Sequence, residues 1–216
     1  RTEAGQLLAL ELMVYANRPD VIILGLPRGG VPVAFQVAQA LKVPLDICLV
    51  RKLGVPGQPE LAMGAIAMGG VMVINDEIVA SMSISRQVMA QVAAQEQHEL
   101  ERRDRLYRGD RPLPNVRHRT VILIDDGIAT GSTLRAAIAT LQKQQPEQIV
   151  IAIPVAPLST CAVLKTEVDQ LICLNMPQPL YSISYWYKDF TQTSDDEVRR
   201  LLQSAPPTPI IASRSL

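Results

Sequence analysis

Short apolar runs alternate with helical patterns through most of the chain. The runs are rich in β-branched residues and are typical of strands buried on both faces, at residues 21–26, 45–52, 120–125, 148–155 and 170–174. Apolar positions recur at helical spacing in the segments between them, at residues 31–41, 133–144 and 158–166. This alternation predicts an α/β fold with a doubly wound, mainly parallel sheet.

The remaining segments complete the predicted elements. Helices are expected at residues 2–16 and 84–107, the second with a polar end that faces solvent. Residues 53–60 combine Gly and Pro, which is typical of a mobile loop or hairpin tip, and two short strands follow within 62–74. A last helix is expected to begin after Ser194, which can cap its first turn.

The length suits a single core. With 216 residues, 48% of them hydrophobic, the chain is expected to form one domain over residues 1–205. Residues 206–216 show no periodicity and are expected to be a loosely held tail. Because the sequence does not begin with Met, the native chain could be longer at its N-terminus.

Charge, hydropathy and cysteine content argue against a nucleic-acid or membrane partner and indicate the cellular compartment. Lys and Arg total 21 and Asp and Glu total 21, so no global positive field exists to hold a nucleic acid. The longest apolar run, residues 61–74, is shorter than the roughly 18 residues that a membrane span needs, and no signal peptide is evident. An odd number of cysteines without CxxC spacing indicates thiols in a reducing compartment, and therefore a cytoplasmic protein.

The strongest chemical signal is VILIDDGIATGST at residues 121–133. Asp125 and Asp126 end a predicted strand, at the edge where open α/β sheets bind ligands. The loop after them can surround a phosphate with backbone N–H groups and hydroxyls at a helix N-terminus. The two carboxylates would repel that phosphate, so they are expected to face hydroxyl donors or a divalent cation. A sugar phosphate meets both demands; the alternative is a capped strand-to-helix turn without a ligand.

This segment resembles the phosphoribosyl pyrophosphate (PRPP) signature of the type I phosphoribosyltransferases. As a whole, the chain is most similar to a bacterial group of predicted members of that family whose acceptor is not established. The resemblance implies that Asp125 and Asp126 contact the ribose 2- and 3-hydroxyls. It also implies that the loop holds the 5-phosphate through Ala129, Thr130, Gly131, Ser132 and Thr133.

A second segment, LPRGG at residues 26–30, resembles the pyrophosphate loop of the same family. The resemblance implies that the backbone of Gly29 and Gly30 approaches the diphosphate and that Arg28 adds charge-assisted hydrogen bonds. The alternative is a plain turn between a strand and a helix, in which the glycines supply backbone freedom.

A third segment, VRKLGVPGQPELAMGAI from residue 50, resembles the second strand of the family with its flexible catalytic loop. Arg51 or Lys52 would meet the pyrophosphate there. Neighbouring side chains of a strand point to opposite faces, so only one of the two is expected to reach the ligand, and the choice between them stays open.

The resemblance implies a glycosyltransferase of nucleotide metabolism that moves the phosphoribosyl group from PRPP to a nucleobase-like acceptor. Mg²⁺ would arrive with PRPP, near the acidic pair, rather than in a site made by the protein alone. The base would lie under a hood drawn from residues 174–200 and 53–75, where Trp186 could stack on it and Asp189 could accept from an N–H group. Hood packing is the alternative for both residues.

Two further expectations concern class and assembly. A PRPP-binding regulator or sensing module without turnover is the alternative to a transferase. Dimers are common in the family, and the long helix at 84–107 could form the contact of a homodimer.

Overall fold

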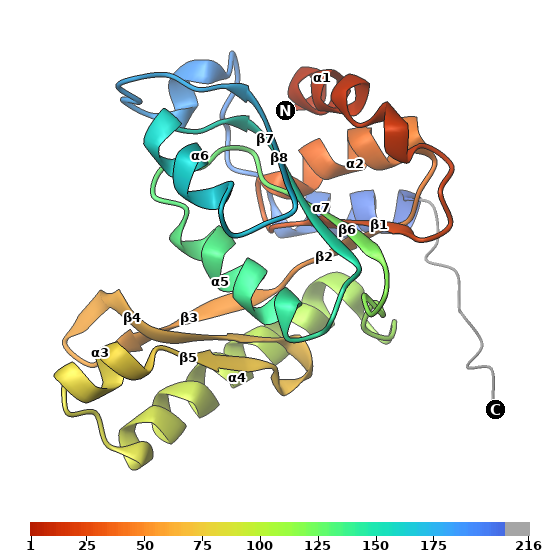
Figure 1. Ribbon diagram of the computed structural model, residues 1–216. Coiled ribbons are helices and arrows are strands. Elements are labelled where there is room, and N and C mark those ends of the chain that lie inside the picture. Colours follow the sequence, from red (N-terminus) through yellow and green to blue (C-terminus); the bar gives the residue numbers. More distant parts are fainter. Residues whose placement is uncertain (206–216) are drawn as a thin grey trace.

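A computed structural model of the chain describes residues 1–205, with the backbone alone for Glu60; the tail expected at 206–216 lies outside the described residues. The larger sheet has five parallel strands in the order β2-β1-β6-β7-β8 (Figure 1). These strands are β1 (Val21–Gly25), β2 (Leu45–Ile47), β6 (Thr120–Ile124), β7 (Gln148–Val155) and β8 (Gln170–Asn175). The predicted α/β fold with a mainly parallel sheet is confirmed.

Helices cover both faces of this sheet. One face packs against α1 (Thr2–Glu11), α2 (Gly30–Leu41) and α7 (Asp195–Ser204), and the other against α5 (Ser132–Gln142) and α6 (Leu158–Leu164). Neighbouring residues of one strand therefore enter different hydrophobic clusters: Val121 packs on the side of α5, and Ile122 on the side of α2. Continuous apolar runs are what a strand between two helical layers requires.

The predicted strand at residues 45–52 is two strands in two different sheets. β2 ends at Ile47, although the Cys48 N–H still donates to the Gly25 carbonyl at 3.0 Å. A three-stranded antiparallel sheet then begins, made of β3 (Val50–Val55), β4 (Gln58–Ala67) and β5 (Met72–Ile74). The apolar pattern continues across the change of sheet, so the sequence carries no sign of the break.

The hairpin between β3 and β4 is longer than the sequence pattern suggested. Of the two structures expected at 53–60, a mobile loop or a hairpin tip, the structure has the hairpin: most of the segment is strand, and the turn is confined to residues 56–57. Gly57 has φ of 80°, which L side chains rarely adopt. Gly and Pro here mark the tip of a hairpin rather than a loop.

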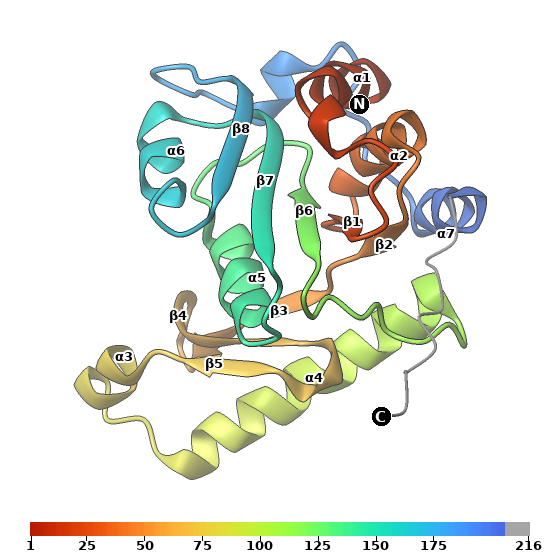
Figure 2. The same cartoon turned by 45° about the vertical axis from the view of Figure 1, so that its right-hand side comes forward.

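Two helices connect the antiparallel sheet to the rest of the molecule. The sequence pattern missed the first, α3 (Asp76–Ser81), whose first turn is capped by the side chain of Asn75. The second, α4 (Arg86–Arg108), agrees with the helix predicted at 84–107, and its last turns reach α7 (Figure 2). Within residues 1–205, no helix combines the length and the apolar character that crossing a bilayer demands.

A buried ion pair fastens α4 to the parallel sheet. Arg108 is 4% exposed, and its Nη2 donates to Oδ1 of Asp46 at 2.8 Å and to the Ile47 carbonyl at 3.2 Å. Asp104, one turn earlier in α4, pairs with the same guanidinium. These contacts hold the end of α4 at the point where the chain leaves the parallel sheet.

Replacing the buried cation tests this attachment. Arg108→Met should lower the free energy of unfolding by about 3 kcal/mol, because Asp46 would remain buried without its partner. Urea unfolding measures the effect. Arg102→Met, which removes an exposed arginine of the same helix, is the control and should leave the midpoint unchanged. Equal losses in the two variants would contradict a special role for Arg108.

Candidate active site

Two of the predicted ligand loops leave the sheet side by side. β1 and β6 are parallel neighbours, with Gly25 paired to Ile124 at their carboxyl ends. The Leu26 N–H donates to the Ile124 carbonyl at 2.8 Å, so residues 26–29 and 125–131 start from the same edge. In Figure 2 the loop after β6 lies at the top of this sheet. Ligands of open α/β sheets bind at such an edge.

The glycines of the first loop are needed for close contact. A Cβ on Gly29 would lie 2.0 Å from Oδ2 of Asp126, and one on Gly30 would lie 2.6 Å from the Ile124 carbonyl oxygen. Gly29 has φ of −63°, which every L residue adopts, so backbone freedom is not the reason for glycine here. The peptide bond between Pro27 and Arg28 is cis. The close contacts at Gly29 and Gly30 show that the turn packs its backbone directly against the acidic pair.

The two aspartates differ in their surroundings. Burial, and next the charge of Asp126, raise the pKa of Asp125 well above its ordinary value. Oδ1 of Asp125 accepts from the Asp126 N–H at 2.8 Å, and Oδ2 of Asp126 accepts from Nε of Arg1 at 2.8 Å. Within residues 1–205, Oδ1 of Asp126 has no hydrogen-bond partner. The pair can thus offer an oxygen to the hydroxyl of a ligand.

The N-terminus of α5 forms the anion-binding part of the site. Gly131 is its N-cap residue, with φ of 75° and no capping side chain of its own; the Ser132 N–H makes a long hydrogen bond of 3.5 Å to the Thr130 hydroxyl oxygen. The hydroxyls of Thr130 and Ser132 lie 3.2 Å apart, and both residues, with Thr133, are exposed. The Ala129 carbonyl accepts from the Thr160 hydroxyl at 3.0 Å, which ties the loop to α6. Open N–H groups and hydroxyls at a helix N-terminus are suited to a phosphate.

Arg28 is held at the edge of this site by the C-terminal helix. Its Nη1 lies 3.7 Å from Oδ1 of Asp195, the first residue of α7. The Tyr107 hydroxyl donates to the same oxygen at 2.6 Å, and burial, with this hydrogen bond second, raises the pKa of Tyr107 to about 12. Arg28 is one-third exposed, so an anion can reach it.

Arg51 and Lys52 lie in β3, away from the other predicted residues. Nε of Arg51 donates to Oε2 of Glu96 in α4 at 2.6 Å. Figures 1 and 2 both show the antiparallel sheet below α5, whereas the loop at 125–131 lies above that helix. The structure therefore brings together the acidic pair, the phosphate loop and the glycine turn, and leaves β3 apart from them.

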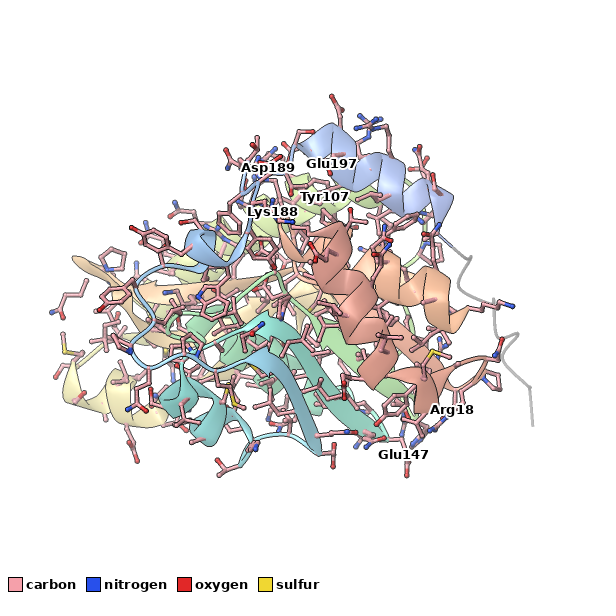
Figure 3. All side chains as sticks on the ribbon, turned by 90° about the horizontal axis from the view of Figure 1, so that it is seen from above. Arg18, Tyr107, Glu147, Lys188, Asp189 and Glu197 are labelled. Atoms are coloured by element: carbon pink, nitrogen blue, oxygen red, sulfur yellow. The ribbon has the colours of Figure 1, made fainter. Side chains whose placement is uncertain are left out.

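A cavity of about 430 Å³ opens at the carboxyl ends of β7 and β8, and Arg1, which donates to Asp126, is one of its lining residues. It is lined by both residues expected to meet the base, Trp186 and Asp189. Trp186 is 46% exposed. Oδ1 of Asp189 accepts from the Thr191 hydroxyl and N–H, and these hydrogen bonds lower the pKa of Asp189. Figure 3 shows Asp189 and Lys188 on the segment that passes α1.

The N-terminal half of α1 forms the opposite wall of this cavity, which the sequence pattern did not indicate. Arg1, Glu3 and Leu7 line it. Tyr187 is a further contact that was not predicted, and its hydroxyl donates to the Asp126 carbonyl. Tyr187 belongs to an aromatic-rich segment, and that composition could have indicated a role in the site. Arg1 precedes an ordinary helix, and nothing in the local sequence indicated that it would reach the site.

Mg²⁺ bound together with a substrate fits these residues. Mg²⁺ prefers oxygen ligands and is usually held by one or two carboxylates, substrate phosphates and water. Asp125 and Asp126 supply two carboxylates beside the anion-binding loop. In the part of the chain that the structure describes, no group of three or more His, Cys, Asp or Glu residues could hold a metal ion without such a substrate.

The chain is similar to known proteins in sequence and in fold. A family model, the phosphoribosyl transferase domain, matches residues 4–178. Two proteins of Mycobacterium tuberculosis, from strains CDC 1551 and H37Rv, are each named "Putative phosphoribosyl transferase". Both are 42% identical over 205 residues, which make up 95% of this chain and 46% of theirs. The chain thus spans about half the length of these curated relatives.

A solved structure extends the likeness to three dimensions. The protein TT1426 from Thermus thermophilus has a TM-score of 0.83 and 36% identity, over 93% of this chain and 95% of that one. The purine phosphoribosyltransferase from Pyrococcus horikoshii is more distant, with a TM-score of 0.43 and 22% identity. That second likeness is too low to bear on the acceptor.

The raised pKa of Asp125 predicts a pH-dependent cost to stability. Unfolded, Asp125 ionises near its ordinary pKa of 3.8, whereas the folded protein retains the proton to higher pH. Between the unfolded and the folded pKa of Asp125, the native state therefore binds more protons than the unfolded state. The free energy of unfolding falls as pH rises through this range. Asn does not ionise, so Asp125→Asn does not lose stability in this way. Its free energy of unfolding should exceed that of wild type by more near neutral pH than below about pH 4.

Urea unfolding at both pH values measures this difference. Asp20→Asn is a matched control of opposite sign, because the hydrogen bond from Arg18 lowers the pKa of Asp20. Asp20→Asn should lose stability near neutral pH and converge with wild type in acid. A gain in Asp125→Asn that does not change with pH would contradict the prediction.

The contact at Gly29 predicts a steric effect on ligand binding. Gly29→Ala should cost about 2 kcal/mol of stability, because the new methyl group overlaps the Asp126 carboxylate. It should also remove the stabilisation expected from PRPP, the ligand that the sequence resemblance implies, measured as the shift in melting temperature. Gly70→Ala, where φ is 74° and no atom lies within 4 Å of the new Cβ, is the control for a glycine replaced away from the acidic pair: it should lose stability through backbone strain and keep the PRPP shift. A normal PRPP shift in Gly29→Ala would contradict the importance of this contact.

Proposed function

The chain belongs to the phosphoribosyl transferase domain family, and on this premise we propose that it transfers the 5-phosphoribosyl group of PRPP to a nitrogenous base with release of pyrophosphate. The observation that carries the proposal is the packing of the glycine turn against the acidic pair, so close that a Cβ added at Gly29 would overlap the Asp126 carboxylate. This contact puts groups for a diphosphate, two hydroxyls and a phosphate on one edge of the sheet. PRPP carries all three.

Each part of PRPP has a matching part of the site. The 5-phosphate takes the first-turn N–H groups of α5 and the hydroxyls of Thr130, Ser132 and Thr133. The ribose 2- and 3-hydroxyls donate to Asp125 and Asp126. The diphosphate lies along the backbone of Gly29 and Gly30, within reach of Arg28. These contacts require residues of separate loops, which the fold places together.

The reaction needs stabilisation of charge more than covalent chemistry. A nitrogen of the base bonds to C1 of the ribose as the bond from C1 to the pyrophosphate oxygen breaks, through a transition state with oxocarbenium character. Arg28 would exchange its contact with Asp195 for the departing diphosphate, where negative charge grows. Mg²⁺ bound with the diphosphate would neutralise part of the same charge. Asp125 and Asp126 would hold the ribose, and the negative charge of the pair would favour positive charge at C1 once the ribose and Mg²⁺ are bound.

Arg51 or Lys52 would contribute only after a movement. Their strand belongs to the antiparallel sheet, and Arg51 is paired with Glu96. Closure of the hairpin between β3 and β4 over the bound substrates would bring this strand toward the diphosphate and exclude water. The two residues therefore stay candidates for a role in the closed complex.

The base would occupy the cavity of about 430 Å³ beside the acidic pair, a volume suited to a small heterocycle. Trp186 would stack on the ring. Asp189 keeps Oδ2 free of partners within residues 1–205, and this oxygen would accept from a ring or exocyclic N–H group. The proposed acceptor class is thus a nitrogenous base with at least one N–H donor.

Thermal unfolding with PRPP and Mg²⁺ tests the donor site. A ligand that binds only the folded state, at about 100 times its Kd, adds roughly 2.7 kcal/mol of stability. For a chain of this size that is about 5–10 °C in melting temperature. Asp126→Asn should lose this shift and retain the fold, because the neutral amide is a weaker acceptor for the ribose hydroxyls.

Two controls separate the parts of the proposal. Ribose 5-phosphate with Mg²⁺ should give a smaller shift, because it lacks the diphosphate. Adenine, hypoxanthine, guanine, uracil and orotate, each added with PRPP, test for pyrophosphate release. A full shift in Asp126→Asn would remove the acidic pair from the site. Stabilisation by PRPP without pyrophosphate release from any base would favour a binding module over a transferase.

A further inference from the structure

The side chain of Arg1 joins separate parts of the chain at the candidate site. Its Nε donates to Oδ2 of Asp126 at 2.8 Å, Nη2 lies 2.8 Å from the same oxygen, and Nη1 donates to the Thr191 carbonyl at 2.8 Å. The guanidinium also lies over the ring of Phe190, 4.4 Å from its centroid. The side chains of Arg1 and Asp126 are each 13% exposed, so solvent screens this pair much less than a surface salt bridge.

The packing of α1 delivers this arginine to the sheet edge. Gly5 of α1 rests on α2 so closely that a Cβ there would lie 2.6 Å from both Cβ of Gln36 and the Val33 carbonyl oxygen. Glycine at this crossing lets the two helices approach until their backbones nearly touch. Gly5 lies one helical turn after Arg1. Its contact with α2 therefore fixes the first turn of α1, and with it Arg1, at the carboxyl ends of the strands.

Arg1 does not block the acidic pair. It occupies Oδ2 of Asp126, while Oδ1 of the same carboxylate has no hydrogen-bond partner within residues 1–205. One oxygen of Asp126 therefore remains for a ribose hydroxyl while the other is held by the guanidinium. The ion pair and a bound ribose are compatible.

The same guanidinium holds the aromatic segment, which we define as residues 181–191. Tyr187 and Phe190 lie with ring centroids 5.1 Å apart, and the Tyr187 hydroxyl donates to the Asp126 carbonyl. Arg1 adds its contacts to Phe190 and Thr191. Trp186 and Asp189, which line the cavity, belong to this segment. The wall that would receive the base is thus fastened to the loop that would receive the ribose.

We infer that Arg1 is a positioning residue: it ties the aromatic segment to Asp126 and so sets the distance between the acceptor cavity and the ribose-binding carboxylates. The inference rests on the proposed function. Transfer to C1 requires the base nitrogen close to the ribose, so a loosened segment would weaken base binding more than PRPP binding.

Three variants of the protein test the inference. Arg1→Ala removes the clamp, and Arg1→Lys keeps the charge but loses the planar fork that spans Asp126 and Thr191. Arg18→Ala is the matched control: Arg18 also pairs with an aspartate, Asp20, and lies over an aromatic ring, that of Tyr15 at 5.5 Å. Figure 3 shows Arg18 far from Asp189 and Lys188.

Hydrogen exchange provides a readout that needs no ligand. Amide exchange within residues 186–191 should be about tenfold faster in Arg1→Ala, the effect of losing one charge-assisted contact. It should be intermediate in Arg1→Lys and unchanged in Arg18→Ala. Unchanged exchange in Arg1→Ala would overturn the inference whatever the protein binds.

Tryptophan fluorescence provides the ligand readout, because Trp186 is the only tryptophan of the chain. Wild type is titrated with adenine, hypoxanthine, guanine, uracil and orotate in the presence of PRPP and Mg²⁺. For a base that quenches, the half-saturating concentration should rise about tenfold in Arg1→Ala. The PRPP-induced shift in melting temperature should persist, because Oδ1 of Asp126 is untouched.

The outcomes separate this inference from the proposed function. Equal weakening of base and PRPP in Arg1→Ala would overturn the positioning role and leave the transferase proposal standing. Absence of both PRPP stabilisation and base quenching in wild type would overturn the proposed function and, with it, the positioning role. Faster exchange together with selective weakening of the base supports the inference.

Discussion

The contact between the backbone of Gly29 and the carboxylate of Asp126 is the constraint on which the rest of the site depends. It exists because β1 and β6 are adjacent parallel strands that end at the same level, and because no side chain separates the two loops. Any larger residue would push the turn away from the acidic pair. Groups for a diphosphate and for ribose hydroxyls would then no longer share one edge of the sheet.

Charges at this edge are balanced by the two ends of the described chain. Asp126 is paired with Arg1, directly before α1, and Arg28 approaches Asp195, the first residue of α7. Burial meanwhile favours the neutral form of Asp125. The charges of the site without substrate are therefore largely paired. A substrate that brings a diphosphate would replace the contact of Arg28 with Asp195, whereas the ion pair of Arg1 and Asp126 would remain. Placing these contacts requires both ends of the described chain to be folded onto the sheet.

The antiparallel sheet shares no strand with the parallel sheet; residues 48–49 connect β2 directly to β3, and α4 provides the second attachment. Arg108 at the end of α4 is bound to Asp46 at the point where the chain leaves the parallel sheet. Arg51 is bound to Glu96 of the same helix. Leu53 and Met63 of the hairpin are fully buried in the hydrophobic cluster that also contains residues of α2, so the closure that we propose would have to keep or replace these contacts.

The sequence by itself determined the parallel strands and the loops at residues 26–30 and 125–133. Buried strands appear as continuous apolar runs, and each of these loops is a local motif whose chemistry is carried by neighbouring residues. Only the tertiary structure decided that the run at 45–52 is divided between two sheets, because the division depends on which strands are neighbours and not on hydrophobicity. It also decided that Arg1 meets Asp126 and that α1 forms a wall of the cavity. Those contacts join residues more than a hundred positions apart, and no local pattern of polar and apolar residues carries information about them.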